Sequence, residues 1–429
     1  MLVEVAYGKT RLPVEIPDEN LQKVFRVRHW PGLANPAQAI EASLVNPIDS
    51  APLADIARGK KNATIVISDI TRPVPNRLLL PPILQTLEGA GMAKDQILIL
   101  IATGMHRPNE GDELIELVGA EIAANYRVEN HFGTDVDSHV DLGTDESGVP
   151  LLVDRRYHEA DLKIVTGLIE PHLIAGYSGG RKGILPGICS LETMKVMHGY
   201  RMIQQERAST GILDGNPFHE TALRLAERVG CDFLVNVTLN DVREMTGVFS
   251  GNLDSAHRAG CREIEKYVVD TIDEPVDIVV TGSGGYPLDQ TLYQAIKGMI
   301  AAKEILKPGG TIIFCSDLGQ GLGSPPFQEL MAQLDSPEGM MARLEEVDYL
   351  KMDQWMVQDF CNILLHAGEI QTCTQGLSSE ELERVHLVPI DSLQSGLERA
   401  FATQGPNATV AALPDGPYVI AQVAEGMLS

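Results

Sequence analysis

The sequence has no paired cysteines, no long apolar run and no excess of basic charge. Its 6 cysteines are scattered and none belongs to a CxxC pair, so we expect neither a zinc site nor a disulfide framework. No apolar run is long enough to span a bilayer, and the N-terminus lacks the pattern of a signal peptide. We therefore expect a cytoplasmic protein in a reducing compartment.

The charge balance limits the classes of partner. Acidic side chains outnumber basic ones by 59 to 34, which gives a formal net charge of −25 at pH 7. This balance argues against nucleic acid and against an anionic membrane as partners. If the substrate is an anion, the cations that hold it must be placed locally, against the field of the whole chain.

Length and pattern predict the fold class. A chain of 429 residues is too long for one ordinary domain. Buried strand, polar loop and helix follow one another repeatedly, which is typical of parallel βαβ units. The pattern restarts after a polar break at Asp273-Glu-Pro275. We predict an α/β protein of two domains, each built around a mostly parallel sheet with flanking helices, with the active site in the inter-domain cleft.

The expected boundary lies near residue 272. Residues 1–272 are expected to form an N-terminal domain that binds the cofactor and carries the catalytic residues, and residues 273–429 a C-terminal domain. The last stretch, about 20 residues, is expected to pack back on the first domain. A helix that ends at Gly91 should carry Pro81 and Pro82 in its first turn. The apolar pattern predicts further helices at 191–201 and 289–302 and strands at 64–68, 96–102, 162–168, 233–239, 277–281, 311–316, 362–366 and 409–413.

One stretch, residues 169–187, stands out for its glycines. It follows the apolar run 162–168, and its composition excludes a regular helix or strand. The stretch is therefore a loop at the end of a strand, where open α/β sheets bind ligands. Exposed backbone N–H groups next to Arg181 and Lys182 suit an anion such as phosphate, although the loop is not a Walker motif. The alternative is a glycine-rich turn with two solvated cations.

Polar side chains follow three successive predicted strands of the first half. Loops after parallel strands converge on one crevice, so we expect these side chains to face a shared site. A single histidine is more often structural than catalytic, and three on or just after successive loops bring a structural and a catalytic role to about even odds. The residues are Asp69 and Arg72, then His106 and Arg107, then His172, Arg181 and Lys182, with His198 on the helix that follows.

The second half offers one comparable motif. On a helix, Asp289, Tyr293 and Lys297 have the spacing i, i+4, i+8 and share one face. The glycine-rich segment 282–285 precedes them at a strand end and turns the start of the helix toward the predicted cleft. The alternative is a solvated helix with a ladder of surface contacts.

Taken together, six motifs resemble the nickel-dependent lactate racemase family. They occur in the family's order between about residues 60 and 305, and their number and order make the match specific. The motifs are Ser68-Asp-Ile-Thr-Arg-Pro, Thr103-Gly-Met-His-Arg-Pro, Glu170-Pro-His, Gly176-Tyr-Ser-Gly-Gly-Arg-Lys, Met197-His-Gly and Tyr286-Pro-Leu-Asp-Gln with Tyr293-Gln and Lys297.

The resemblance implies a nickel pincer nucleotide as cofactor, which is a pyridinium-3,5-bisthiocarboxylic acid mononucleotide that binds nickel through S, C and S. The lysine that tethers it covalently falls on Lys182, and the nickel ligand falls on His198. A cofactor with three donors needs one protein ligand, and soft donors with an imidazole suit square-planar nickel. Further cofactor contacts are expected from Asp69, Tyr177, Ser178, Gly179, Gly180 and Arg181.

The reaction that the resemblance implies is inversion of C2 in a 2-hydroxy acid, a racemase or epimerase activity. A hydride leaves C2 for the cofactor and returns to the other face of the 2-keto acid, while His106 and His172 act as acid and base. The unperturbed pKa of imidazole, about 6.5, suits both roles. The family's substrate-binding residues fall on Arg72, Tyr293, Gln294 and Lys297, and Trp355 either closes the pocket or belongs to the core.

Three other functions stay open at this point. A nicotinamide-dependent oxidoreductase would fit hydride chemistry, but no strand is followed by GxGxxG with an acidic residue beyond it. A metal-dependent hydrolase could use His106, His172 and His198 as zinc ligands. A non-catalytic carrier of the nickel cofactor would not need both His106 and His172. Proteins that make or deliver the cofactor are further candidate partners, and the sequence leaves the particular 2-hydroxy acid open.

Overall fold

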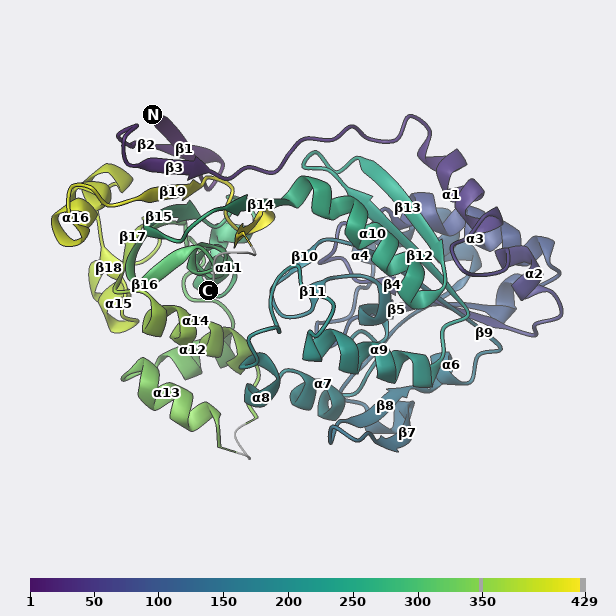
Figure 1. Cartoon of the computed structure of the whole chain (residues 1–429). Helices are drawn as coiled ribbons and strands as arrows, with labels where there is room; N and C mark the ends of the chain where they lie inside the picture. The colour runs from purple at the N-terminus through teal and green to yellow at the C-terminus, as the bar shows by residue number, and fades with distance from the viewer. Residues whose placement is uncertain (347–349, 425–429) are drawn as a thin grey trace. The chain divides into compact units, whose positions relative to one another are not determined.

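The computed structural model describes residues 1–346 and 350–424, which belong to two compact units (Figure 1). The terminal unit contains both ends of the chain, residues 1–28 and 267–429, together with Gly199–Arg201. The middle unit contains residues 29–198 and 202–266. No helix in the described ranges is long and apolar enough to cross a membrane. Each unit is described below by itself.

The middle unit is built on a six-stranded sheet with the order β13-β12-β9-β4-β5-β6. All neighbouring strands are parallel except β12 and β13. The chain runs outward from β4 to one edge and then returns to the other side of β4, so the strand order reverses between β4 and β9. Open α/β sheets bind ligands at such a reversal. The strands are β4 (Ala63–Ser68), β5 (Ile97–Ala102), β6 (Arg127–Asn130), β9 (Leu162–Leu168), β12 (Phe233–Leu239) and β13 (Met245–Gly251).

Helices cover the middle sheet because its central strands are apolar on both faces. Ile65 and Ile67 of β4 join a core cluster with helix residues such as Leu80, and the alternate residue Val66 is equally buried. The helices are α1 (Pro36–Val45), α2 (Leu53–Ala57), α3 (Asn76–Gly89), α4 (Asp112–Val118), α5 (Ala120–Asn125), α6 (Arg155–His158), α7 (Leu191–Met197), α9 (Pro217–Val229) and α10 (Leu253–Val268), with the short α8 (Tyr200–Ile203) between α7 and α9. Small antiparallel pairs are β7 (His139–Thr144) with β8 (Pro150–Asp154), and β10 (Pro171–His172) with β11 (Gly176–Tyr177).

The terminal unit has a second six-stranded sheet, entirely parallel, with the order β18-β17-β16-β15-β19-β3. An antiparallel hairpin of β1 (Leu2–Tyr7) and β2 (Thr10–Glu15) packs on the same core cluster as α16. The other strands are β3 (Leu21–Val24), β14 (Val269–Ile272), β15 (Val276–Gly282), β16 (Leu306–Cys315), β17 (Glu369–Cys373), β18 (Val388–Pro389), β19 (Val410–Leu413) and β20 (Ile420–Val423). The helices are α11 (Leu292–Lys303), α12 (Pro325–Met331), α13 (Pro337–Leu344), α14 (Gln354–His366), α15 (Ser379–Arg384) and α16 (Leu393–Gln404).

The predicted fold class, two α/β domains with mostly parallel sheets and flanking helices, is confirmed. The units differ from the expected ranges 1–272 and 273–429 because residues 1–28 join the C-terminal half. The cause is long-range pairing: β3 adds to the sheet edge beside β19, and the hairpin buries Val5 and Ile16 against that sheet. Near the C-terminus, β20 pairs with β14 of the same unit, and residues 425–429 lie outside the described ranges.

Three local predictions are wrong. Residues 362–366 form the last turns of α14, not a strand, because a short apolar run cannot distinguish a buried helix from a strand. Pro81 and Pro82 lie inside α3, which begins earlier, at Asn76. Burial of Leu79, Leu80, Ile83 and Leu84 in α3 outweighs the missing N–H groups. The helix expected at 191–201 is broken at His198, which caps α7.

Candidate active site

The three predicted loops leave neighbouring strands at the carboxyl edge of the middle sheet. Asp69 follows β4, His106 follows β5, and residues 169–187 follow β9. β4 lies between β5 and β9, so its loop adjoins both of the others. The reversal of strand order between β4 and β9 opens the crevice in which doubly wound sheets bind ligands.

Asp69 and His106 form a hydrogen-bonded pair in this crevice. Asp69 is 4% exposed, and its Oδ2 lies 2.6 Å from Nδ1 of His106. Burial alone would raise the pKa of Asp69, but hydrogen bonds from His106 and Thr71 lower it below its usual value. A carboxylate can only accept, so Nδ1 of His106 carries the proton. In neutral His106 the lone pair is then on Nε2, on the far side of the ring from Asp69.

Arg72 binds a carboxylate from the neighbouring loop. Its Nη1 lies 3.4 Å from Oε1 of Glu170, and the side chains are 39% and 34% exposed. An ion pair with this exposure contributes little stability. Its significance is geometric, because it joins the loops after β4 and β9 and shows that Arg72 can hold a carboxylate at this edge.

His172 has the opposite proton arrangement to His106. Its Nδ1 accepts hydrogen bonds from the backbone N–H groups of Ile174 (3.3 Å) and Ala175 (3.2 Å). An accepting Nδ1 leaves the proton of the neutral ring on Nε2. The small hairpin of β10 and β11 fixes this geometry by pairing His172 with Gly176.

A tight turn positions Lys182. Gly179 and Gly180 have φ of +74° and +53°, which glycine adopts readily. A Cβ on Gly180 would lie 2.6 Å from the His257 ring, and one on Gly179 would lie 2.7 Å from Oδ1 of Asn236. The same Asn236 oxygen accepts from the Gly180 N–H at 2.8 Å. The glycines therefore permit close packing of the turn.

The polar groups of the turn bond mainly to the turn itself. Arg181, 1% exposed, donates to the carbonyls of Tyr177 (3.0 Å) and Ala175 (2.6 Å), and burial lowers its pKa to about 10. Ser178 Oγ donates to Leu168 O and accepts from Glu170 N. The Tyr177 hydroxyl is buried and has no hydrogen-bond partner among the described residues. These contacts hold Ser178 and Arg181 within the turn, and the phosphate-binding role expected from the sequence stays a prediction.

Lys182 and His198 approach the same aromatic ring. The Lys182 amine lies 5.0 Å from the ring centroid of Phe218, and the His198 ring lies 5.2 Å from it. Burial, together with Arg181 and Arg72, lowers the pKa of Lys182 well below its usual value. Burial therefore favours the uncharged, nucleophilic form of this amine, which suits Lys182 to forming a covalent bond with an acyl group.

His198 is also held neutral. It is 8% exposed, and burial, with a smaller contribution from Lys182, lowers its pKa to about 3. Its Nδ1 lies 3.1 Å from the carbonyl of Met194 and donates to it, so the lone pair is on Nε2. Such a second hydrogen bond is typical of metal-binding histidines. Across residues 1–346 and 350–424, no three His, Cys, Asp or Glu side chains are grouped to hold a metal ion.

The remaining predicted residues belong to the terminal unit. Tyr293, Gln294 and Lys297 lie on α11, and the Tyr293 hydroxyl accepts from Nε1 of Trp355 at 3.1 Å. Burial and the neighbouring Asp353 raise the pKa of Tyr293, so it is a neutral hydrogen-bonding group. Asp289 is not on their helix, because it lies in a separate 3₁₀ turn, Leu288–Gln290, and is fully buried.

Sequence reasoning missed several residues of the site. Glu170 could have been predicted, because it belongs to the motif Glu170-Pro-His that also contains His172. Phe218, Asn236 and His257 gave no local signal. They act on the Lys182 turn from α9, β12 and α10, across separations in sequence that no motif spans.

The fold and this site define a two-domain α/β enzyme with histidines and a buried lysine at the carboxyl edge of a doubly wound sheet. Two family models match the chain: the lactate racemase N-terminal domain over residues 7–211 and the lactate racemase C-terminal domain over residues 271–421. The chain belongs to the lactate racemase family, and its class of enzyme is an isomerase of the racemase type.

Individual relatives agree along nearly the whole length. The chain is 36% identical over 424 residues to a lactate racemase of Lactiplantibacillus plantarum, which covers 97% of this chain and 99% of the relative. A lactate racemase of Thermoanaerobacterium thermosaccharolyticum is 33% identical over 97% of this chain and 98% of its own. The solved structure of the lactate racemase apoprotein from that organism has a TM-score of 0.92, covering 98% of this chain and 100% of its own at 32% identity. A solved structure from Thermotoga maritima shares the fold. It is 17% identical, has a TM-score of 0.66, and covers 92% of this chain and 100% of its own.

Proposed function

We propose that this chain inverts C2 of a small 2-hydroxy acid by moving the C2 hydrogen as a hydride. Lactate, which appears in the names of its relatives, is the first candidate substrate. The observation that carries the proposal is that the Asp69–His106 pair and the Arg72–Glu170 pair both join loops that leave neighbouring strands where the strand order reverses. A proton acceptor and a carboxylate-binding cation are what a 2-hydroxy acid requires.

The residues present fit the nickel pincer nucleotide of the family. Burial favours the uncharged amine of Lys182, which suits a covalent tether, and a neutral His198 with its lone pair on Nε2 suits one metal bond. Both approach Phe218, so one group can reach the two side chains together. When bound, this group supplies an acceptor for the hydrogen of C2.

The histidines divide the proton work. His106 Nε2 accepts the proton of the substrate hydroxyl, and Asp69 holds the ring and stabilises the positive charge that develops on it. His172, in the tautomer that its backbone contacts favour, donates from Nε2 to the substrate oxygen. To act as a base it must first move its proton to Nδ1, which displaces the N–H groups of Ile174 and Ala175.

Arg72 binds the substrate carboxylate. In the structure, the carboxylate of Glu170 lies 3.4 Å from the guanidinium of Arg72. The substrate carboxylate displaces Glu170 and forms two shorter, parallel hydrogen bonds to the guanidinium. We also propose that Tyr293, Gln294 and Lys297 of α11 help to bind the substrate.

Isotope retention tests the reaction. Cofactor-loaded protein is incubated with single enantiomers of C2-deuterated 2-hydroxy acids, and the products are separated on a chiral column with mass detection. We expect inversion of lactate with the deuterium kept on C2. Loss of the deuterium to solvent would mean direct proton abstraction and would overturn the hydride proposal.

The cofactor contacts are tested without turnover. Lys182→Arg keeps a long nitrogen-containing side chain, but its guanidinium lacks the amine that forms the acyl bond, so the intact mass should lack the cofactor increment that the wild type carries. His198→Gln should keep the increment and lose most of the nickel by elemental analysis. A full increment on Lys182→Arg would place the tether elsewhere, and full nickel on His198→Gln would remove that ligand.

A further inference from the structure

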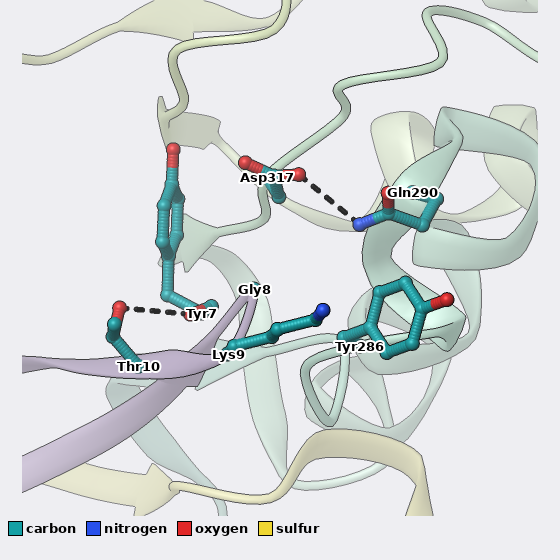
Figure 2. Close-up of a pocket in the computed structure, with 7 residues that line it drawn as sticks. All are labelled: Tyr7, Gly8, Lys9, Thr10, Tyr286, Gln290 and Asp317. Atoms are coloured by element: carbon teal, nitrogen blue, oxygen red, sulfur yellow. Dashed lines mark hydrogen bonds between the residues drawn. The ribbon is translucent and has the colours of Figure 1, made fainter.

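A pocket of about 410 Å³ lies within the terminal unit. Figure 2 shows its walls, formed by the tip of the β1–β2 hairpin and by the loops that follow β15 and β16. Its size is in the range of small-molecule sites, and the carboxyl ends of parallel strands are where such sites occur. The lining residues are Tyr7, Gly8, Lys9, Thr10, Tyr286, Gln290 and Asp317.

Hydrogen bonds to Asp289 hold the walls of the pocket in place. This fully buried carboxylate accepts from the N–H of Gly8 at 2.5 Å and from the side-chain amide of Gln290 at 3.2 Å. The Tyr286 N–H donates back to the Gly8 carbonyl at 2.8 Å. The hairpin tip is thereby attached to a loop more than half the chain away, and no rearrangement is needed to form the walls.

Two opposite charges face this space without pairing. Among the described residues, neither Lys9 nor Asp317 has an ion-pair partner. The Lys9 amine lies 4.9 Å from the ring centroid of Tyr286, and Asp317 accepts from Gln290 at 3.1 Å. In Figure 2, Lys9 lies below the space, Asp317 and Gln290 lie above it, and the Tyr7 ring forms its left wall.

We propose that this pocket binds a small carboxylic acid that carries a hydrogen-bond donor on the neighbouring carbon and an aromatic side chain. The carboxylate pairs with Lys9, and the donor, an ammonium or a hydroxyl group, pairs with Asp317. The side chain lies against Tyr7 and Tyr286, whose rings provide apolar contact. α-Amino acids and 2-hydroxy acids share this chemistry. The proposal does not depend on the racemase reaction, since its residues are separate from those assigned to it.

Three probes with the same carbon skeleton distinguish an ammonium donor from a hydroxyl donor and from no donor. Phenylalanine has the ammonium group, 3-phenyllactate has the hydroxyl group, and 3-phenylpropionate has neither. Each enantiomer of the first two compounds, and the achiral 3-phenylpropionate, are titrated calorimetrically into the full-length protein. We expect phenylalanine or 3-phenyllactate to bind at least tenfold more tightly than 3-phenylpropionate, and the tighter of the two identifies the donor.

Matched variants locate the site. Lys9→Met and Asp317→Asn should each weaken that binding at least tenfold. Lys303→Met, which removes an amine that pairs with Glu304 elsewhere in the same unit, should leave it unchanged. All three variants should keep the wild-type racemisation rate. Equal binding of 3-phenylpropionate, no saturable binding of any probe, or unchanged affinity in Lys9→Met would overturn the proposal.

Discussion

The proton arrangement of two histidines is decided by single neighbouring groups. Asp69 requires a proton on Nδ1 of His106, whereas two backbone N–H groups require a bare Nδ1 on His172. The two imidazoles, interchangeable in the sequence, therefore present different atoms to a substrate. We infer that the identity of the partner at Nδ1, and not the histidine itself, assigns the role of each ring.

Asp69→Asn tests this directly. Asparagine keeps the shape, but its amide can present an N–H to His106 and favour the wrong tautomer, so we expect kcat to fall about 10²-fold or more. Steady-state racemisation by loaded enzyme is the measurement. Asp55→Asn, which alters an exposed carboxylate paired with Arg58, is the control and should be unaffected. A wild-type rate in Asp69→Asn would separate this carboxylate from catalysis.

The pH dependence of stability follows from the same carboxylate. The pKa of Asp69 is lower in the folded protein than its unfolded value of about 3.9. Its ionised form therefore stabilises the fold fully above the unfolded pKa, and this contribution is lost as pH falls through the folded pKa. Thermal melts should show wild type more stable than Asp69→Asn near neutral pH, with the difference shrinking as the pH falls below about 4. A difference that grows in acid would contradict the assignment.

At the scale of elements, the turn that carries Lys182 depends on α10 and β12. His257 of α10 lies against the turn and donates to the Ser178 carbonyl at 2.8 Å, and Asn236 of β12 binds Gly180. The turn has little regular structure of its own, so its shape comes from these two elements. Tight packing makes it sensitive to an added methyl group.

Gly180→Ala should therefore destabilise the protein by roughly 1–3 kcal/mol, since the new Cβ meets the His257 ring at 2.6 Å and the residue has a positive φ. Gly89→Ala is the matched control, because no atom of the described residues lies within 4 Å of that Cβ at the end of α3. The control should be neutral or slightly stabilising. The apparent melting temperatures of the two variants are measured. Equal values would show that the turn can move to accept the added methyl group.

At the scale of the molecule, the chain passes from the terminal unit to the middle unit and back. Residues 1–28 join the unit formed chiefly by residues 267–429. The pairing of β3 with β19 and the burial of Val3, Val5, Val14 and Ile16 hold them there. The N-terminal segment is therefore part of a core encoded at the other end of the chain.

A protease site inserted between Arg28 and His29 tests this organisation. After cleavage we expect the peptide 1–28 to elute with the rest of the protein in native buffer and to separate only in denaturant. The same cut in an Ile16→Asn background should release it, because that side chain is fully buried in the shared core. Release of the wild-type peptide in native buffer would mean that the segment is only loosely attached.

Local pattern determined a large part of this structure. Apolar runs such as 64–68 and 233–239 predicted strands correctly, because a strand buried on both faces has few polar residues. The polar loops after the runs 64–68 and 96–102 could be expected at one sheet edge, and the structure brings Asp69 of the first loop and His106 of the second into hydrogen-bond contact. The short run 362–366 failed, because its few residues do not reveal a helical period.

Tertiary structure alone decided the rest. No local pattern could show that residues 1–28 complete the sheet of the C-terminal half, or that Phe218 lies beside both Lys182 and His198. Nor could it show that Asp289 leaves the face of α11 to hold the tip of the first hairpin. The sequence by itself determined which segments are buried and which residue types end each strand, since these depend on neighbours along the chain. Pairing partners, tautomers and shifted pKa values depend on neighbours in space, which only the folded chain supplies.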